Sequence, residues 1–303
     1  MSPYPSNTMS DAYPSFSVIV PTRARPRQLA ACLDALAALD YPRERYDVIV
    51  VDDGSPKPPR QAVDALGGRL PVRLLEQSNR GPATARNRGA AASAADYLAF
   101  TDDDCRPAPD WLSVFARRFA AGPEALYGGH TENSLKDNVY AETSQLLIDY
   151  LYAHYVDAGG QPRFAPTSNF AVRRDLFLRT GAFDERFPLA AGEDREFCDR
   201  WRGLGYAIRY EPEAKVFHDH RMGAREFLRQ HFFYGRGAYH YWRAHAHRNA
   251  GGLRVEPASF YQRMISFPFT VSAGHPNRAG LATLLVLSQF ANAAGFFRER
   301  LRR

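Results

Sequence analysis

Three consecutive carboxylates, Asp102, Asp103 and Asp104, directly follow a short apolar segment at residues 97–101. Like charges this close repel one another, so the cluster is expected to hold a cation when the protein works. Mg²⁺ and Mn²⁺ prefer carboxylate oxygens and keep open positions for phosphate oxygens. The cluster therefore favours a Mg²⁺ or Mn²⁺ site that holds a nucleotide diphosphate. A solvated acidic turn is the alternative that the triplet alone leaves open.

The segments that would position this cluster alternate between strands and helices. Apolar runs at 16–22 and 47–51 predict buried strands, and an Ala-rich helix with a proline near its start is predicted at 79–90. This alternation predicts an α/β fold with a mostly parallel sheet flanked by helices. Ligands of such sheets bind beyond the carboxyl ends of the strands. Thr22, Asp53 and the acidic triplet all fall at that edge.

Seven segments, in this order along the chain, resemble the family-2 glycosyltransferases. They are VIVPT (18–22), VVDDGS (50–55), NRG with ARNRG (79–81 and 85–89), FTDDD (100–104), SNFAVRR (168–174), GAFDERF (181–187) and GEDREFCDR (192–200). The resemblance covers roughly residues 15–220 and implies a catalytic domain with the nucleotide-sugar-binding GT-A fold. It also implies an inverting transferase that moves a sugar from a nucleotide diphosphate-sugar to a hydroxyl group.

The same resemblance implies where the nucleotide binds. Asp53 matches the carboxylate that accepts a hydrogen bond from a pyrimidine ring N–H. Uracil and thymine both offer that donor, so a UDP- or dTDP-type sugar is expected. A turn carboxylate that caps the following segment is the alternative. Pro21 and Thr22 would line the other side of the nucleotide. Arg86 would contact the diphosphate or ribose, with an exposed helix arginine as the alternative.

For the metal, the resemblance implies that Asp104 is the direct ligand, while Asp102 and Asp103 contact ribose or metal-bound water. The ion would act as a Lewis acid that stabilises the leaving diphosphate. A further ligand is predicted at His218, where related enzymes often carry a metal-binding histidine. His220 is a rival, because residues two apart in a strand point to the same face.

Glu193 and Asp194 match the acidic pair on the acceptor side of the family. Transfer to an alcohol needs a base that removes the proton as the oxygen attacks. Asp194 is predicted to be that base, and Glu193 is predicted to orient the acceptor. Direct attack opposite the leaving group would invert the anomeric centre. The alternative is that the pair caps a helix, since acidic side chains stabilise the positive end of a helix.

Composition fits a soluble, cytoplasmic enzyme of 303 residues, 45% of them hydrophobic. Cys32, Cys105 and Cys198 lack metal-type spacing and suit a reducing compartment. The net charge of +6 permits anionic partners, but no nucleic-acid-binding module can be recognised, so no nucleic acid partner is expected. Residues 1–14 lack the apolar core of a signal or transit peptide and are predicted to be a disordered lead-in.

Residues 221–303 match no specific segment of the family and are predicted to form a helical extension. Its aromatic stretch at 227–242 is expected to pack beneath the active site or to lie on a membrane. The last helix is amphipathic, and its basic end suits peripheral contact with an anionic membrane; packing on the protein or on a second subunit is the alternative. Its apolar stripe is Leu287, Phe290, Ala294, Phe297 and Leu301, opposite Ser288, Asn292 and Glu299.

Two other function classes share parts of this pattern. A sugar nucleotidyltransferase would carry a Gly-rich basic loop after the first strand, but residues 21–26 contain no glycine. A non-catalytic nucleotide-sugar-binding protein would retain Asp53 yet tolerate the loss of Asp194. The transferase is the predicted function, and its acceptor is expected to be a hydroxyl on a glycan or a lipid-linked intermediate.

Overall fold

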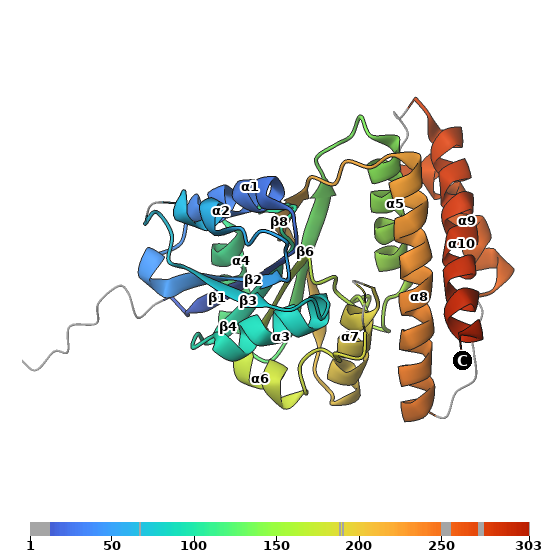
Figure 1. Cartoon of the computed structure of the whole chain (residues 1–303). Helices are drawn as coiled ribbons and strands as arrows, with labels where there is room; N and C mark the ends of the chain where they lie inside the picture. The colour runs from blue at the N-terminus through green and yellow to red at the C-terminus, as the bar shows by residue number, and fades with distance from the viewer. Residues whose placement is uncertain are drawn as a thin grey trace, which may run out of the picture.

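The structure is a computed structural model that describes residues 13–66, 68–187, 189, 191–249, 256–271 and 276–302. Most of the lead-in predicted at 1–14 therefore lies outside the described residues. A central sheet carries helices on both faces, and the C-terminal helices stand together against one side of this α/β unit (Figure 1).

Eight strands form one sheet in the order β3-β2-β1-β4-β7-β6-β8-β5. The strands are β1 (Phe16–Thr22), β2 (Tyr46–Asp53), β3 (Val72–Gln77), β4 (Tyr97–Thr101), β5 (Cys105–Pro107), β6 (Leu126–Asn133), β7 (Asn169–Arg173) and β8 (Ile208–His218). Strands β3, β2, β1 and β4 are parallel neighbours, as are β6 and β8. Strand β7 runs antiparallel between β4 and β6, and β5 runs antiparallel to β8. The predicted α/β fold with a mostly parallel sheet is confirmed.

The helices cover the sheet because alternate strand residues face opposite ways. Val18 and Val20 of β1 join the core under α1, α2 and α4, whereas Ile19 joins the core over α3, α6 and α7. The helices are α1 (Pro26–Ala37), η2 (Arg43–Arg45), α2 (Arg60–Asp64), α3 (Pro82–Ala92), α4 (Trp111–Ala121), α5 (Val139–His154), α6 (Arg174–Arg179), α7 (Glu193–Gly203), α8 (Ala224–Asn249), α9 (Ala258–Val271) and α10 (Arg278–Leu301).

Strand β8 corrects one prediction. Residues 216–220 are predicted to form a strand with both histidines on one face, but the strand observed runs from Ile208 to His218. It stays continuous because it pairs along β6 through a bulge at Gly129 and His130. His220 therefore follows the strand. The pairing of His218 with Cys105 across β8 and β5 brings this histidine next to the acidic triplet.

Helix α8 lies between the α/β unit and the last helix. A Cβ atom at Gly237 would overlap the carbonyl oxygen of Ala191, just before α7, so only glycine permits this approach. Further along, Arg248 Nη2 lies 2.9 Å from Asp199 Oδ2 of α7. On its other side α8 packs against α10, where a Cβ at Gly235 would overlap the carbonyl oxygen of Asn292. The aromatic stretch of α8 thus lies between α7 and α10 (Figure 1).

Candidate active site

The carboxyl ends of β1, β2 and β4 bring together the residues that the sequence placed at one edge. Thr22 is buried and donates a hydrogen bond from Oγ1 to Asp103 Oδ2 at 2.7 Å. Pro21 lies beside it, partly exposed, near the end of β1. Burial raises the pKa of Asp103 to about 6, although the nearby Arg25 charge opposes this shift. The first strand and the acidic triplet therefore form one connected wall.

Asp104 is the point where this wall meets β8. Its Oδ1 lies 3.2 Å from His218 Nε2, and its Oδ2 lies 4.0 Å from His220 Nδ1. Burial alone would raise the pKa of this carboxyl, but the hydrogen bond from His218 and the charges of His218 and Arg25 hold it well below its usual value. Asp104 is thus ionised and faces two imidazoles.

This donor set fits a hard divalent ion. Ligand atoms of Asp104, Cys105 and His218 lie within 4.8 Å of one another. Cys105 is fully buried, and burial raises the pKa of its thiol well above the usual value, so it is a neutral core group. A carboxylate and an imidazole then remain as ligands, with Asp103 adjacent. Mn²⁺ and Mg²⁺ accept such oxygen-rich sites and take the rest of their ligands from phosphate and water.

Arg25 is a site residue that the sequence reasoning missed. Its Nη1 lies 3.1 Å from Asp103 Oδ1 and 2.9 Å from Asp104 Oδ2, so one guanidinium nitrogen joins two of the three carboxylates. It follows Ala24, whose positive φ of 55° turns the chain back toward the sheet edge. The signal in the sequence is an arginine three residues after the end of the first strand, at the edge where three carboxylates are expected.

Arg86 connects the acidic triplet to the acidic pair of α7. Its Nη2 lies 2.7 Å from Asp102 Oδ1, and its Nη1 lies 2.9 Å from Glu193 Oε1. Only 3% of the side chain is exposed, so Arg86 is a buried ion-pair residue and the alternative of an exposed helix arginine is wrong. Its two terminal nitrogens already contact carboxylates. The arrangement therefore indicates that Arg86 positions Asp102 and Glu193 relative to each other.

Glu193 and Asp194 form the first turn of α7. Glu193 is buried, and its Oε2 has no hydrogen-bond partner among the described residues. Burial and the adjacent Asp194 charge raise the pKa of Glu193 to about 7, against the opposing effect of Arg86. Asp194 is partly exposed, accepts a hydrogen bond from the Arg195 N–H at 2.7 Å, and has its pKa raised by burial. Of the two, Asp194 is the carboxylate that a substrate can reach.

Asp53 is placed at the end of β2, where its carboxylate organises the loop that leads into α3. Gln77 and Asn79 donate side-chain hydrogen bonds to it at 2.8 and 2.7 Å. The backbone N–H groups of Arg80 and Gly81 donate to the same carboxylate at 2.8 and 2.9 Å. These four donors match the roughly four lone-pair sites of a carboxylate. A pyrimidine N–H would have to replace one of them, so the base contact stays a prediction.

The raised pKa of Glu193 leads to a testable pH dependence. Because this pKa is higher in the folded protein than the ordinary value of 4.5, the folded state binds more protons between about pH 4.5 and 7. Protonation of Glu193 therefore contributes fully to the free energy of unfolding at low pH. This contribution is lost as pH rises through about 7. Glu193→Gln carries a side chain that does not titrate. It is therefore expected to remove this pH-dependent part of the unfolding free energy.

Urea unfolding at pH 5, 6, 7 and 8 measures the effect, with Glu185→Gln as a control at an exposed glutamate. Wild-type and Glu185→Gln proteins should lose unfolding free energy as pH rises through this window, whereas Glu193→Gln should show a flatter profile. Parallel profiles for all three proteins would show that Glu193 titrates normally.

Comparisons with known proteins identify relatives of this chain. A pre-mycofactocin glycosyltransferase of Mycobacterium tuberculosis is 29% identical over 240 residues, which are 78% of this chain and 49% of that protein. The chain thus spans about half the length of that relative. Glycosyltransferase AglE of Haloferax volcanii is 27% identical over 237 residues, covering 77% of this chain and 76% of its own.

Solved structures show the same fold. A mannosyltransferase from Pyrobaculum calidifontis, in complex with GDP-Man and Mn²⁺, matches with a TM-score of 0.67 at 18% identity, covering 94% of this chain and 87% of that chain. TarS of S. aureus in complex with UDP-GlcNAc matches with a TM-score of 0.56 at 17% identity, covering 95% and 91%. The family model for glycosyl transferase family 2 matches residues 17–181, more than half of the chain. The chain therefore belongs to glycosyl transferase family 2.

Proposed function

We propose that this protein is a metal-dependent, inverting glycosyltransferase that uses a nucleotide diphosphate-sugar. The observation that carries the proposal is the single ion-paired unit in which Arg86 joins Asp102 of the acidic triplet to Glu193 of the α7 pair. Donor-side and acceptor-side carboxylates are thereby held at a set separation. Family membership favours sugar transfer over a sugar nucleotidyltransferase or a binding protein.

Each part of the site has a role in this proposal. Asp104 and His218 would hold Mg²⁺ or Mn²⁺, which supplies Lewis-acid stabilisation of the departing diphosphate. Asp103, held by Thr22, and Asp102, held by Arg86, would face the ribose and phosphates. Asp194 would accept the proton of the attacking hydroxyl, and Glu193 would orient the acceptor. One direct displacement inverts the anomeric centre and needs no nucleophilic side chain.

The donor we propose is a UDP- or dTDP-sugar, and the acceptor is a hydroxyl on a glycan or lipid-linked intermediate. The structural neighbours bind GDP-Man in one case and UDP-GlcNAc in another, so the base is the part of the donor to test first. Thermal shifts with Mn²⁺ and a panel of UDP-, dTDP- and GDP-sugars test it. Stabilisation by GDP-sugars alone would overturn the assignment of Asp53 as a pyrimidine contact.

Arg25 gives a prediction about the metal site. Its guanidinium and a divalent ion would compete for the same oxygens of Asp103 and Asp104. Arg25→Gln is therefore expected to tighten binding of Mn²⁺ in the absence of nucleotide by roughly fivefold, the equivalent of about 1 kcal/mol for one partly exposed ion pair. Titration calorimetry with Mn²⁺ alone measures this, with the exposed neighbour Arg23→Gln as the matched control. Equal affinities in the three proteins would mean that Arg25 does not compete with the ion.

We further propose that the protein acts in the cytoplasm at the inner face of a membrane, with its C-terminal helices in peripheral contact. Among the described residues, one helix, Arg278–Leu301, is long and apolar enough to cross a bilayer by length and composition. Its packing against α8 supports contact along the membrane surface.

A further inference from the structure

We propose that α10 lies in the plane of an anionic lipid bilayer, with its apolar stripe directed into the acyl chains. This inference deepens the proposed function, on which it rests for the site of action, by naming the surface and its lipid chemistry. The stripe faces outward: Phe290 is 71% exposed and Leu301 82%, with Phe297 at 51% and Leu287 at 43%. Large apolar side chains along one helix face mark an interaction surface.

The opposite face of α10, which carries Leu281, Leu285 and Ser288, is the one that packs on the protein. Ser288 is fully buried and donates a hydrogen bond to the carbonyl oxygen of Leu285 at 2.6 Å. Glu299 Oε2 lies 2.6 Å from Arg236 Nε of α8, and Gly295 permits close contact with the backbone of α8 at Phe232. The contact between α10 and the rest of the chain is thus satisfied without the stripe, and burying the stripe requires an apolar environment outside the chain.

Charge identifies that environment. Residues 224–303 contain twelve arginines and three glutamates, although the whole chain has a net charge of only +6. Arg298, Arg300 and Arg302 are exposed beside the C-terminal end of the stripe. A basic surface next to an apolar stripe is the pattern by which an interfacial helix binds anionic lipids. A second copy of this chain would bring two such basic surfaces together, so the charge favours lipid.

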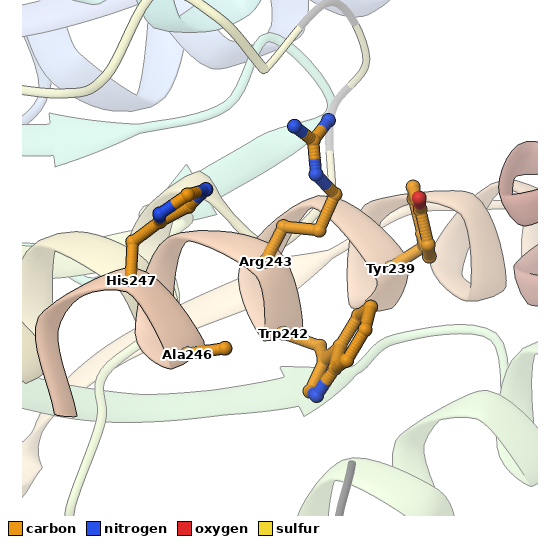
Figure 2. A pocket seen from close by; sticks show the side chains of 5 residues that line it. All are labelled: Tyr239, Trp242, Arg243, Ala246 and His247. Atoms are coloured by element: carbon orange, nitrogen blue, oxygen red, sulfur yellow. The ribbon is translucent and has the colours of Figure 1, made fainter. Parts of the chain in front are cut away.

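An aromatic depression on α8 lies beside Phe296 of α10. Figure 2 shows the side chains of Tyr239, Trp242, Arg243, Ala246 and His247 along this part of the helix. Phe296 of α10 lies 5.4 Å from the Tyr239 ring and 6.2 Å from the Trp242 ring, between centroids, and it directly precedes Phe297 of the stripe.

The packing of α10 on α8 also indicates how α10 is oriented on the bilayer and how the membrane face is placed relative to Asp194. A helix that crossed the bilayer alone would be surrounded by lipid, whereas α10 keeps one face against α8 (Figure 1). Helix α8 in turn contacts Ala191, just before the acidic pair of α7. One intervening helix therefore separates the proposed membrane face from the element that carries Asp194, which suits an acceptor hydroxyl presented by a lipid-linked molecule.

Vesicle co-sedimentation with the full chain tests the inference. Phosphatidylcholine vesicles with 30% phosphatidylglycerol are expected to bind the wild-type protein, and binding should weaken with salt and in pure phosphatidylcholine. A triple change, Phe290→Ser, Phe297→Ser and Leu301→Ser, should weaken binding by at least about 100-fold, because three exposed apolar side chains no longer enter the bilayer. Leu204→Ser is the matched control, since Leu204 is 60% exposed at the end of α7.

Each outcome supports or overturns the inference. Circular dichroism melting checks that the triple variant is folded, which is expected because all three positions are exposed. A folded triple variant that sediments with vesicles like wild type would overturn the proposal. A loss of self-association measured by light scattering, with vesicle binding unchanged, would assign the stripe to a second copy. If wild type binds vesicles but the donor panel gives no turnover or stabilisation, the proposed function fails while the membrane contact stands.

Discussion

Asp194→Asn is expected to lower sugar transfer by roughly 10²- to 10⁴-fold, equivalent to about 3 to 5 kcal/mol of activation free energy. The change keeps the shape of the side chain and removes its ability to take a proton. Asp194 is the less buried member of the α7 pair, and partial burial raises its pKa, which suits a base that must hold a proton transiently. Donor binding should be unchanged, because in the proposal the donor contacts lie on the acidic triplet.

Two measurements separate this role from a structural one. Donor affinity by calorimetry and the melting temperature by circular dichroism should match wild type, while the transfer rate falls. Asp199→Asn is a matched control on the same helix, since Asp199 pairs with Arg248 and His245 away from the acidic triplet. If Asp194→Asn transfers sugar at a near wild-type rate, the carboxylate only stabilises the helix end, and Glu193 becomes the candidate base.

Asp104→Ala is expected to weaken metal-dependent nucleotide binding by at least about 100-fold, equivalent to about 2.7 kcal/mol. Asp104 is the carboxylate that contacts both His218 and Arg25, so its removal takes away the central ligand. Adding a chelator to the wild-type protein should have a similar effect on nucleotide affinity. His218→Ala should weaken binding less, because phosphate and water oxygens still satisfy a hard ion.

Titration of Mn²⁺ and UDP into each variant measures these effects. Asp110→Ala is the control, since this exposed aspartate follows the triplet on the same segment and precedes α4. Equal nucleotide affinity with and without metal would remove the metal from the proposal. An unchanged His218→Ala variant beside a damaged His220→Ala variant would transfer the ligand role to His220, whose Nδ1 lies 4.0 Å from Asp104 Oδ2.

The sequence predicts the pattern of strands and helices because that pattern depends on the spacing of apolar residues within each segment. Apolar runs such as 16–22 must be buried on both faces, which specifies a central strand of an α/β sheet. Polar residues that end such strands then fall at one edge, so the sequence alone predicts that Thr22, Asp53 and the acidic triplet lie together. The sequence therefore determined the fold class, the family resemblance and most of the candidate site.

Tertiary structure decided which groups contact one another. The sequence predicts that Arg86 contacts the diphosphate or ribose, but only the folded chain brings it to Glu193, more than one hundred residues away. Likewise, only the pairing of β5 with β8 selects His218 over His220 as the closer histidine to Asp104.

In the last helix, too, the sequence determines one property and the tertiary structure decides another. Its periodicity determined that an apolar stripe opposes a polar face, but periodicity does not determine which face the protein covers. That choice depends on backbone approach: Gly235 and Gly295 allow α8 and α10 to pack closely, and Arg236 pairs with Glu299 across the contact. These partners come from helices far apart in the sequence, so only the folded chain directs Phe290 and Leu301 outward.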